Sequence, residues 1–288
     1  LIGTNQVKRL GIFRLVPVVC ISSVVVSAWA AGRLTVAVSI LALACRQLAE
    51  LALSLVFFPR PSTPEHAREH VGFGARAILG QYAELGTARL DQLILLPLLG
   101  ASALGRYSVC VTITGLPIAA SQALISSRFG RIVRATSHRF SGFVQEMALI
   151  AGVSAILGLV ISGAAIPLLP RLYGSDFANL AFVIALLSAA TVLLSACYAS
   201  GSALTALGRP GLSTMGWLAG VAVTVLSLPW MAQREGIAGA AKVSIAAYLV
   251  ALSVMTLALR YATTSSVTRD ADPIPVVADE ATRQMLNE

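Results

Sequence analysis

Residues 147–169 read MALIAGVSAILGLVISGAAIPLL, a run of 23 residues without a charged side chain. A helix needs about 20 apolar residues to cross the hydrocarbon core of a bilayer, so this run predicts a membrane-spanning helix. Similar windows recur along the chain, and we predict spans near 11–31, 34–57, 78–100, 106–127, 145–168, 177–205, 212–232 and 238–261. The predicted fold is therefore all-α, a polytopic membrane helix bundle of about eight transmembrane helices.

The composition indicates a membrane protein. Of its 288 residues, 57% are hydrophobic and 12% are charged, against roughly a quarter charged in ordinary soluble domains. A soluble fold could not cover that much apolar surface, which argues against a soluble catalytic domain. The four cysteines all lie in apolar runs without C-x-x-C spacing, so we expect free thiols and no cofactor or metal.

Basic residues predict the orientation, because short cytoplasmic loops are enriched in Lys and Arg. Of the 21 basic residues, 14 fall on one side of the predicted bundle. Both termini are therefore predicted to be cytoplasmic. The net charge of +8 follows from this bias, and no basic-aromatic patch predicts nucleic-acid binding. The other seven are those assigned to the outer side, Arg33, Arg106, Arg171 and Arg234, and those in or near the membrane, Arg46, Arg89 and Lys242.

A secretory signal peptide is the alternative interpretation of the first apolar segment. Lys8 and Arg9 precede it, and it ends in Ala28-Trp29-Ala30. The apolar stretch is longer than the 7–15 residues of a signal-peptide core, and a second span follows at once. These two features favour a membrane span.

Two stretches of the chain resemble one protein family. Arg89-Leu90-Asp91-Gln92, followed by Leu99-Gly100-Ala101-Ser102-Ala103-Leu104-Gly105-Arg106-Tyr107, resembles the start of a half-domain in polysaccharide transporters of the multidrug/oligosaccharidyl-lipid/polysaccharide exporter superfamily. The end of the same half-domain is similar to three later pieces, which are Leu172-Tyr173-Gly174-Ser175-Asp176-Phe177, Ala206-Leu207-Gly208-Arg209-Pro210 and Gly236-Ile237-Ala238-Gly239-Ala240-Ala241.

The resemblance implies a flippase that moves a lipid-linked oligosaccharide across the bacterial cytoplasmic (plasma) membrane for cell-envelope polysaccharides, lipopolysaccharide among them. Residues 1–60 would be the last two helices of an incomplete first lobe and 78–261 a six-helix second lobe. The residues themselves predict a cytoplasmic amphipathic linker at 61–77, where Ser62-Thr63-Pro64-Glu65 is typical of a helix start, and a polar cytoplasmic tail at 262–288. Family members have two complete lobes, so we expect a truncated gene product, a fragment or a misassigned start.

Ionisable side chains in the middle of spans are the candidate functional residues, because each costs a few kcal/mol at a helix centre unless it faces water or a partner. Arg89 and Asp91 lie near the midpoint of the third predicted span. Glu84 and Asp91 are seven residues apart and share a helical face, whereas Arg89 lies well around the helix from Asp91. Asp91 therefore needs a neighbour from another helix, a proton or water.

The second predicted span repeats this pattern, with Arg46 and Glu50 four residues apart and able to pair. A lipid-linked oligosaccharide carries a pyrophosphate, which suits the forked donors of Arg89 and Arg46. Asp91, Glu84 or Glu50 would take up a proton and couple transport to a gradient. Structural ion pairs inside the bundle are the alternative. The polar residues expected to line the same cavity are Gln81, Gln92, Thr112, Thr114, Ser121 and Gln122.

An enzyme is not expected from the sequence. His66 and His70 are four residues apart, but no third metal ligand is evident. The predicted external loops are too short to hold a catalytic site. A drug or metabolite antiporter of the same superfamily is the alternative transporter. A truncated, non-transporting membrane scaffold that pairs with envelope polysaccharide assembly proteins is the alternative from another class. The lipid bilayer is the partner common to all three.

The predicted topology is testable with reporter fusions. Fusions after Pro61 and after Arg139 should report the cytoplasm, and fusions near Arg106 and Arg234 should report the outside, because of the basic-residue asymmetry. Alkaline phosphatase and fluorescent-protein activities measure the two outcomes. A periplasmic signal at Arg139 would contradict the helix count.

Overall fold

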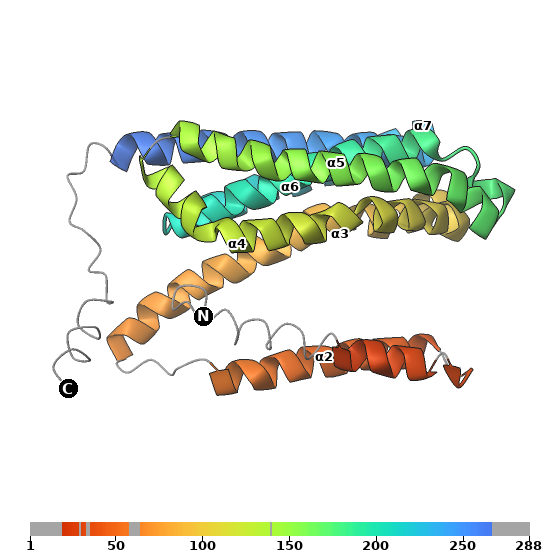
Figure 1. Cartoon of the computed structure of the whole chain (residues 1–288), viewed down its shortest axis with the longest axis horizontal. Helices are drawn as coiled ribbons and strands as arrows, with labels where there is room; N and C mark the ends of the chain where they lie inside the picture. The colour runs from red at the N-terminus through yellow and green to blue at the C-terminus, as the bar shows by residue number, and fades with distance from the viewer. Residues whose placement is uncertain (1–18, 29, 33–34, 58–63, 139, 267–288) are drawn as a thin grey trace. The chain divides into compact units, whose positions relative to one another are not determined.

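The computed structural model describes residues 19–28, 30–32, 35–57, 64–138 and 140–266 (Figure 1). These residues are helical apart from short connections and include no strand. The chain divides into two compact units, Leu1–His70 and Val71–Glu288. The predicted fold class, an all-α membrane helix bundle, is confirmed.

The first unit contains a short apolar helix, Val19–Ala28, and α2, Val36–Phe57. Gly32, with φ of 64°, lies between them, a backbone conformation that glycine adopts without strain. The hydroxyl of Thr35 accepts a hydrogen bond from the N–H of Val38 at 3.3 Å and so caps the start of α2. Both helices line one apolar cavity, which makes them a packed pair.

The second unit begins within α3, Pro64–Thr114, which reverses direction at Gly100. Gly100 has φ of 80°, and Tyr107 hydrogen-bonds to Asp91 at 2.6 Å. In a straight helix, residues 16 apart are about 24 Å apart along the axis. Since an L side chain disfavours positive φ, the glycine at position 100 lets two antiparallel arms form from one run of sequence.

The last helix, α7, Pro210–Ser266, reverses in the same way at Gly236, with φ of 61°. A Cβ atom built on Gly216 would lie 2.5 Å from Cγ of Met255. A Cβ atom built on Gly220 would lie 3.3 Å from the carbonyl oxygen of Ala247. The two arms of α7 therefore pack closely along this glycine pair, as small residues allow in membrane helices.

Between α3 and α7 lie α4, Leu116–His138, α5, Phe140–Tyr173, the 3-10 turn η1, Ser175–Phe177, and α6, Ala181–Ala206. Helix α6 packs against α4, α5 and α7 (Figure 1). The sixth predicted span begins at 177, inside η1, four residues before α6. The predicted second span, 34–57, agrees with α2 to within two residues at each end, and the predicted fifth span, 145–168, lies inside the longer α5.

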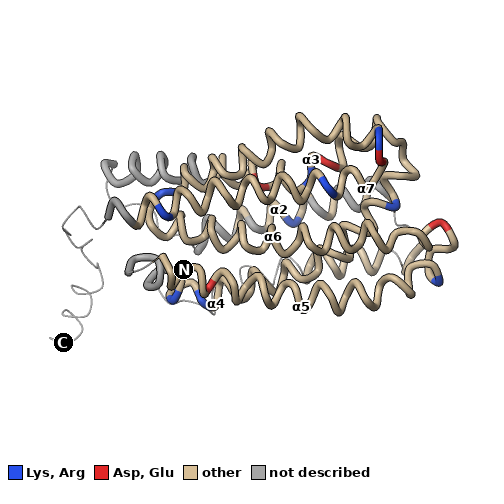
Figure 2. The backbone as a smooth tube through the Cα atoms, turned by 90° about the horizontal axis from the view of Figure 1, so that it is seen from above, with Lys and Arg blue, Asp and Glu red and all other residues tan. Residues whose placement is uncertain are grey.

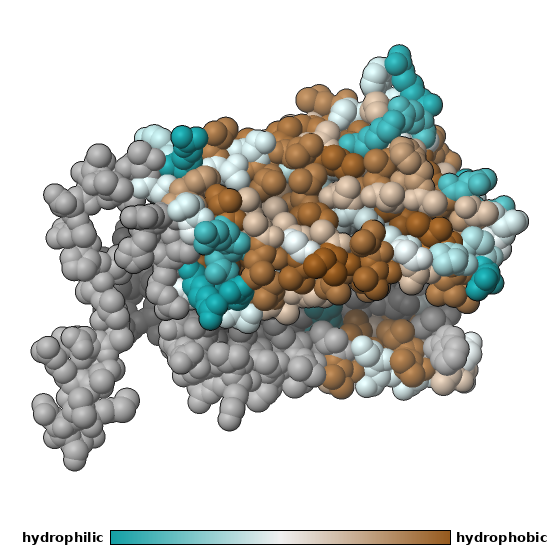
Figure 3. Space-filling model, turned by 45° about the horizontal axis from the view of Figure 1, so that its top comes forward, coloured by the Kyte–Doolittle hydropathy of each residue, from teal (hydrophilic) through white to brown (hydrophobic). Residues whose placement is uncertain are grey.

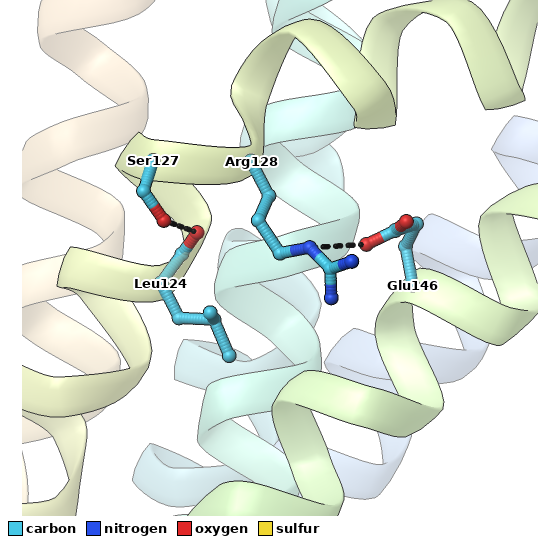
Figure 4. A network of polar contacts seen from close by, with 4 residues as sticks. All are labelled: Leu124, Ser127, Arg128 and Glu146. Atoms are coloured by element: carbon cyan, nitrogen blue, oxygen red, sulfur yellow. Dashed lines mark hydrogen bonds and ion pairs between the residues drawn. The ribbon is translucent and has the colours of Figure 1, made fainter.

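Two connections expected from the sequence are more helical than a loop. Residues 128–144 lie between the fourth and fifth predicted spans. Their described residues form the end of α4 and the start of α5. Arg128 and Glu146 brace this connection, because Nε lies 3.2 Å from the carboxylate Oε2 (Figure 4). The expected linker 61–77 is helical from Pro64 onward and continuous with the span that follows. Its location on a membrane surface stays a prediction.

Apolar side chains cover the outside of the second unit. Leu93, Leu159 and Leu226 are 70%, 77% and 80% exposed. Figure 3 shows a broad apolar band between polar ends, and Figure 2 shows that charged residues lie mostly toward the helix ends. Because water would oppose such exposure, this surface fits a hydrocarbon environment. Among the described residues, four helical segments, two of them containing the reversals, are long and apolar enough to cross a membrane.

The reversal in α7 predicts that Gly239 cannot be replaced. A Cβ atom there would overlap the carbonyl of Met231, whose carbon would lie 2.7 Å away. Gly239→Ala should therefore destabilise the protein by about 1–3 kcal/mol, as overpacking does. Thermal unfolding of the purified protein in detergent measures the loss.

Gly163→Ala is the matched control, because Gly163 also lies within a helix but a Cβ there meets nothing within 4 Å. Alanine at this position should leave the unfolding midpoint unchanged or raise it slightly. Equal behaviour of the two variants would contradict the packing of the α7 arms.

Candidate functional site

A cavity of about 660 Å³ lies in the second unit and is called the central cavity below. Its walls come from the first and second arms of α3, the start of α4, α6 and the second arm of α7. The lining combines apolar side chains with ionisable and hydrogen-bonding groups. Its polar members are Gln81, Glu84, Arg89, Asp91, Thr112, Thr114, Gln122, Thr191, Tyr198, Ser244 and Tyr248.

Helical spacing brings the polar residues of α3 to this cavity. Glu84, Ala88 and Asp91 follow one another at intervals of four and three residues, so they lie on one face. Next to this face, three residues after Glu84, the hydroxyl of Thr87 donates a hydrogen bond to the carbonyl oxygen of Trp217 at 3.0 Å and fixes α3 against α7. The first arm of α3 is thereby held with its polar face toward the cavity.

Asp91 is the most enclosed ionisable residue of the cavity, with 6% of its surface exposed. Tyr107, which is fully buried, donates a hydrogen bond to Oδ2 at 2.6 Å, and the N–H of Gln92 donates to Oδ1 at 2.7 Å. The hydroxyl groups of Tyr107 and Ser244 are 3.4 Å apart. Asp91 thus has the partner from another helical segment that its sequence position demands.

Arg89 lines the same cavity but does not form an ion pair among the described residues. Two other cations are engaged, Arg128 with Glu146 at 3.2 Å and Lys242 with Glu235 at 2.6 Å. Asp91 is occupied by Tyr107 and does not neutralise the guanidinium by direct contact. The arrangement therefore leaves a cationic group available to an anion inside an apolar bundle.

Glu84 connects the central cavity to a second one. Gln81, Glu84 and Tyr198 line both the central cavity and an adjoining cavity of about 340 Å³. The adjoining cavity extends along Gly201 and Thr205 to the α6–α7 connection and includes Pro210, Ser213 and Thr214. This end carries Arg209 and is the predicted cytoplasmic side. Polar lining therefore runs from Asp91 toward that side.

Toward the opposite end, the central cavity is closed by a layer of buried side chains. Leu95, Tyr107, Ile184 and Ala240 are each at most 1% exposed and belong to one packed cluster. Each lies in sequence between a residue that lines the central cavity and one that lines a third cavity near Gly100 and Gly236. We call these four residues the seal.

Most, but not all, of the polar residues predicted to line the cavity are found in its wall. Gln122 lines the central cavity, as do Gln81, Thr112 and Thr114. Gln92 does not line it, and the hydroxyl of Ser121 is buried and donates to the carbonyl oxygen of Pro117 at 3.1 Å.

The predicted pair in the second span lies in the first unit. Arg46 lines a cavity of about 160 Å³ with mainly apolar neighbours, among them Leu41 and Val24. The side chain of Glu50 lies outside the described residues. The pairing of Arg46 with Glu50 stays a prediction.

Sequence reasoning missed the tyrosines and hydroxyl groups of other helices. In the sequence Tyr107 is only part of a motif, and nothing in the pattern marks Tyr198, Tyr248, Thr191 or Ser244 as functional. The only sequence feature that could have identified them is a polar atom inside an apolar window. Many hydroxyl groups that simply hydrogen-bond to their own helix have the same feature. Ser195 and Ser253, for example, donate to carbonyl oxygens four residues earlier.

Comparison with known proteins gives one match. Residues 6–130, less than half of the chain, match a family model described as polysaccharide biosynthesis protein. No curated protein and no solved structure matches the chain. The matched range includes Arg89, Asp91 and Tyr107, whereas the resembling pieces near 172, 206 and 236 lie beyond it. The match supports the resemblance to polysaccharide transporters at a general level and, with the apolar helices, a polysaccharide-related membrane protein.

The Asp91 site predicts a measurable coupling with Tyr107. Tyr107→Phe removes the donor and leaves a buried carboxyl oxygen without its partner, so it should destabilise the protein by about 1–3 kcal/mol. In an Asp91→Ala background the same change should cost less, because the lost partner is then absent. Thermal unfolding of the four variants in detergent measures the difference.

Tyr82→Phe is the control for loss of a hydroxyl, since Tyr82 is on the same helix and 70% exposed. It should leave the unfolding midpoint unchanged. Additive effects of the Tyr107 and Asp91 substitutions would argue that the bond contributes nothing.

Proposed function

We propose that the chain is a flippase subunit or lobe that moves a lipid-linked oligosaccharide across the bacterial cytoplasmic membrane for envelope polysaccharides such as lipopolysaccharide. The observation that carries the proposal is Arg89, a cation without an ion pair in the described part of the chain, on the wall of a cavity within an apolar bundle. The family match adds the link to polysaccharides.

The chemistry of such a substrate fits the lining of the central cavity. A pyrophosphate cannot cross hydrocarbon unaided, because moving its charges from water into an apolar environment has a very large free-energy cost. The guanidinium of Arg89 presents forked donors that match phosphate oxygens. Gln81, Thr112 and Gln122 supply neutral donors and acceptors for sugar hydroxyl groups. The lipid tail would stay in the bilayer.

Asp91 is the coupling residue in this proposal. It takes up a proton from the water of the cavity, which removes a negative charge near Arg89 and strengthens the hold of Arg89 on an anion. The bond from Tyr107 links Asp91 to the second arm of α3, and Ser244 links it to α7. Glu84, beside Tyr198, lies on the polar lining toward the predicted cytoplasmic side and is the second coupling candidate.

The proposal makes the protein a transporter and not an enzyme. Glu84 and Asp91 are two turns apart on one helix and belong to a cavity whose remaining polar groups are amides, hydroxyl groups and Arg89. Such groups bind and release a solute.

Arg89 gives the test. The purified protein is reconstituted with an NBD-labelled polyprenyl pyrophosphate carrying N-acetylglucosamine, and dithionite measures how fast the inner-leaflet lipid becomes accessible. Arg89→Ala should slow this transfer about 10- to 100-fold, since a hydrogen bond to a charged group is lost. Arg89→Lys should recover only part, because an ammonium keeps the charge but loses the fork.

Arg131→Ala is the matched control, because Arg131 is an exposed arginine of α4 outside the cavity lining. It should transfer lipid at the parental rate. Normal transfer by Arg89→Ala would rule out the binding role of Arg89. Transport of drug-like cations in place of the lipid would favour an antiporter, and no transfer by the parental chain would favour the scaffold.

A further inference from the structure

A cavity of about 590 Å³ lies at the end of the second unit where the helices reverse, and it is called the end cavity below. It is formed by α3 on both sides of Gly100, by η1 and the start of α6, and by α7 around Gly236. Its polar lining is Arg106, Ser175, Asp176, Asn179 and Glu235, and Phe182 lies beside them.

The charged groups of the end cavity are only partly satisfied by one another. Nε of Arg106 is buried and has no hydrogen-bond partner within the described part of the chain. Glu235 pairs with Lys242 at 2.6 Å. Neither Arg106 nor Asp176 forms an ion pair among the described residues. A buried donor without a partner is rare in proteins, so Nε of Arg106 is available to an acceptor that enters the cavity.

The mixture of groups selects the class of ligand. A guanidinium, two carboxylates, an amide and a hydroxyl group together carry donors and acceptors in similar number. Because Lys242 compensates Glu235, the charges left without an ion pair are one of each sign: Asp176 would repel an anion and Arg106 a cation. A neutral molecule with many hydroxyl groups can accept from Arg106 and donate to Asp176 at the same time. Phe182, 59% exposed, offers the flat apolar face that a sugar ring covers.

We propose that the end cavity binds sugar units. This inference deepens the proposed function, on which its physiological meaning rests: the sugars are those of the transported lipid-linked oligosaccharide. The seal of Leu95, Tyr107, Ile184 and Ala240 separates the end cavity from the central cavity. The end cavity lies on the predicted outer side, so it holds the glycan after its pyrophosphate has left Arg89.

The test measures protection of a cysteine in the full chain. Ser175→Cys places a thiol on the exposed rim of the cavity, and Cys20→Ser with Cys45→Ser removes the two exposed native thiols. The protein is purified in an amine-oxide detergent that contains no sugar. Maltotriose or tri-N-acetylchitotriose, at ten times its dissociation constant, should slow maleimide labelling about tenfold, because the free fraction falls as 1/(1 + [L]/Kd).

Two variants examine the proposed contacts. Asp176→Asn and Arg106→Gln should each raise the oligosaccharide concentration needed for protection about tenfold, as loss of a charged hydrogen-bond partner does. Asp176 lies on the exposed η1 turn, so its variant should fold normally even where Arg106→Gln does not.

The controls separate this site from the central cavity. Ala101→Cys is exposed at the same end but does not line the end cavity, so sugar should not slow its labelling. Arg89→Ala should slow lipid transfer about 10- to 100-fold and leave protection of Ser175→Cys unchanged. If sugar protects Ser175→Cys but the protein transfers no lipid, the proposed function is contradicted and the sugar site is not. The sugar site would be overturned if sugar did not slow labelling of Ser175→Cys or slowed labelling of Ala101→Cys equally. It would also be overturned if inorganic pyrophosphate, and not sugar, gave the protection.

Discussion

The hydrogen bond from Tyr107 to Asp91 is the interaction on which the second unit depends. A carboxyl group in the middle of an apolar helix needs a polar partner, and the side chain that hydrogen-bonds to Asp91 lies 16 residues later. That partner arrives only because Gly100 reverses the chain. The bond of 2.6 Å therefore fixes the angle and register of the two arms of α3. The positions of Ser244 and the cavity wall follow from that register.

The same bond determines what Arg89 can do. If Asp91 turned to Arg89, the two charges would cancel and the cavity would contain a structural ion pair. Tyr107 satisfies the carboxyl group without neutralising the guanidinium. Arg89 keeps its charge in a bundle whose outer surface is apolar, and an anion in the central cavity is the group that would benefit most. A neutral hydrogen-bond partner for Asp91 is thus a condition for anion binding.

Most of the fold could be predicted from the sequence because the spacing of apolar runs reports the bilayer directly. The spans of α2 and α5 and the reversals near Gly100 and Gly236 follow from hydropathy and glycine placement. The helical connection at 128–144 could not be predicted, because an ion pair between Arg128 and Glu146 stabilises it across two helices. The helical face of Glu84 and Asp91 was predictable from spacing. Tyr107 as partner was not, since it depends on how far the second arm slides along the first.

Tyr107 also joins two functions that are separate in the sequence. Its ring belongs to the seal between the central cavity and the end cavity, and its hydroxyl group holds Asp91. A protonated Asp91 has one acceptor oxygen fewer and gains a donor, so the geometry preferred by the Tyr107 hydroxyl changes with it. Because the ring is fully buried and closely packed, it cannot shift without moving Leu95 or Ile184. A change of charge at Asp91 therefore acts first on the side chain that separates the central cavity from the end cavity.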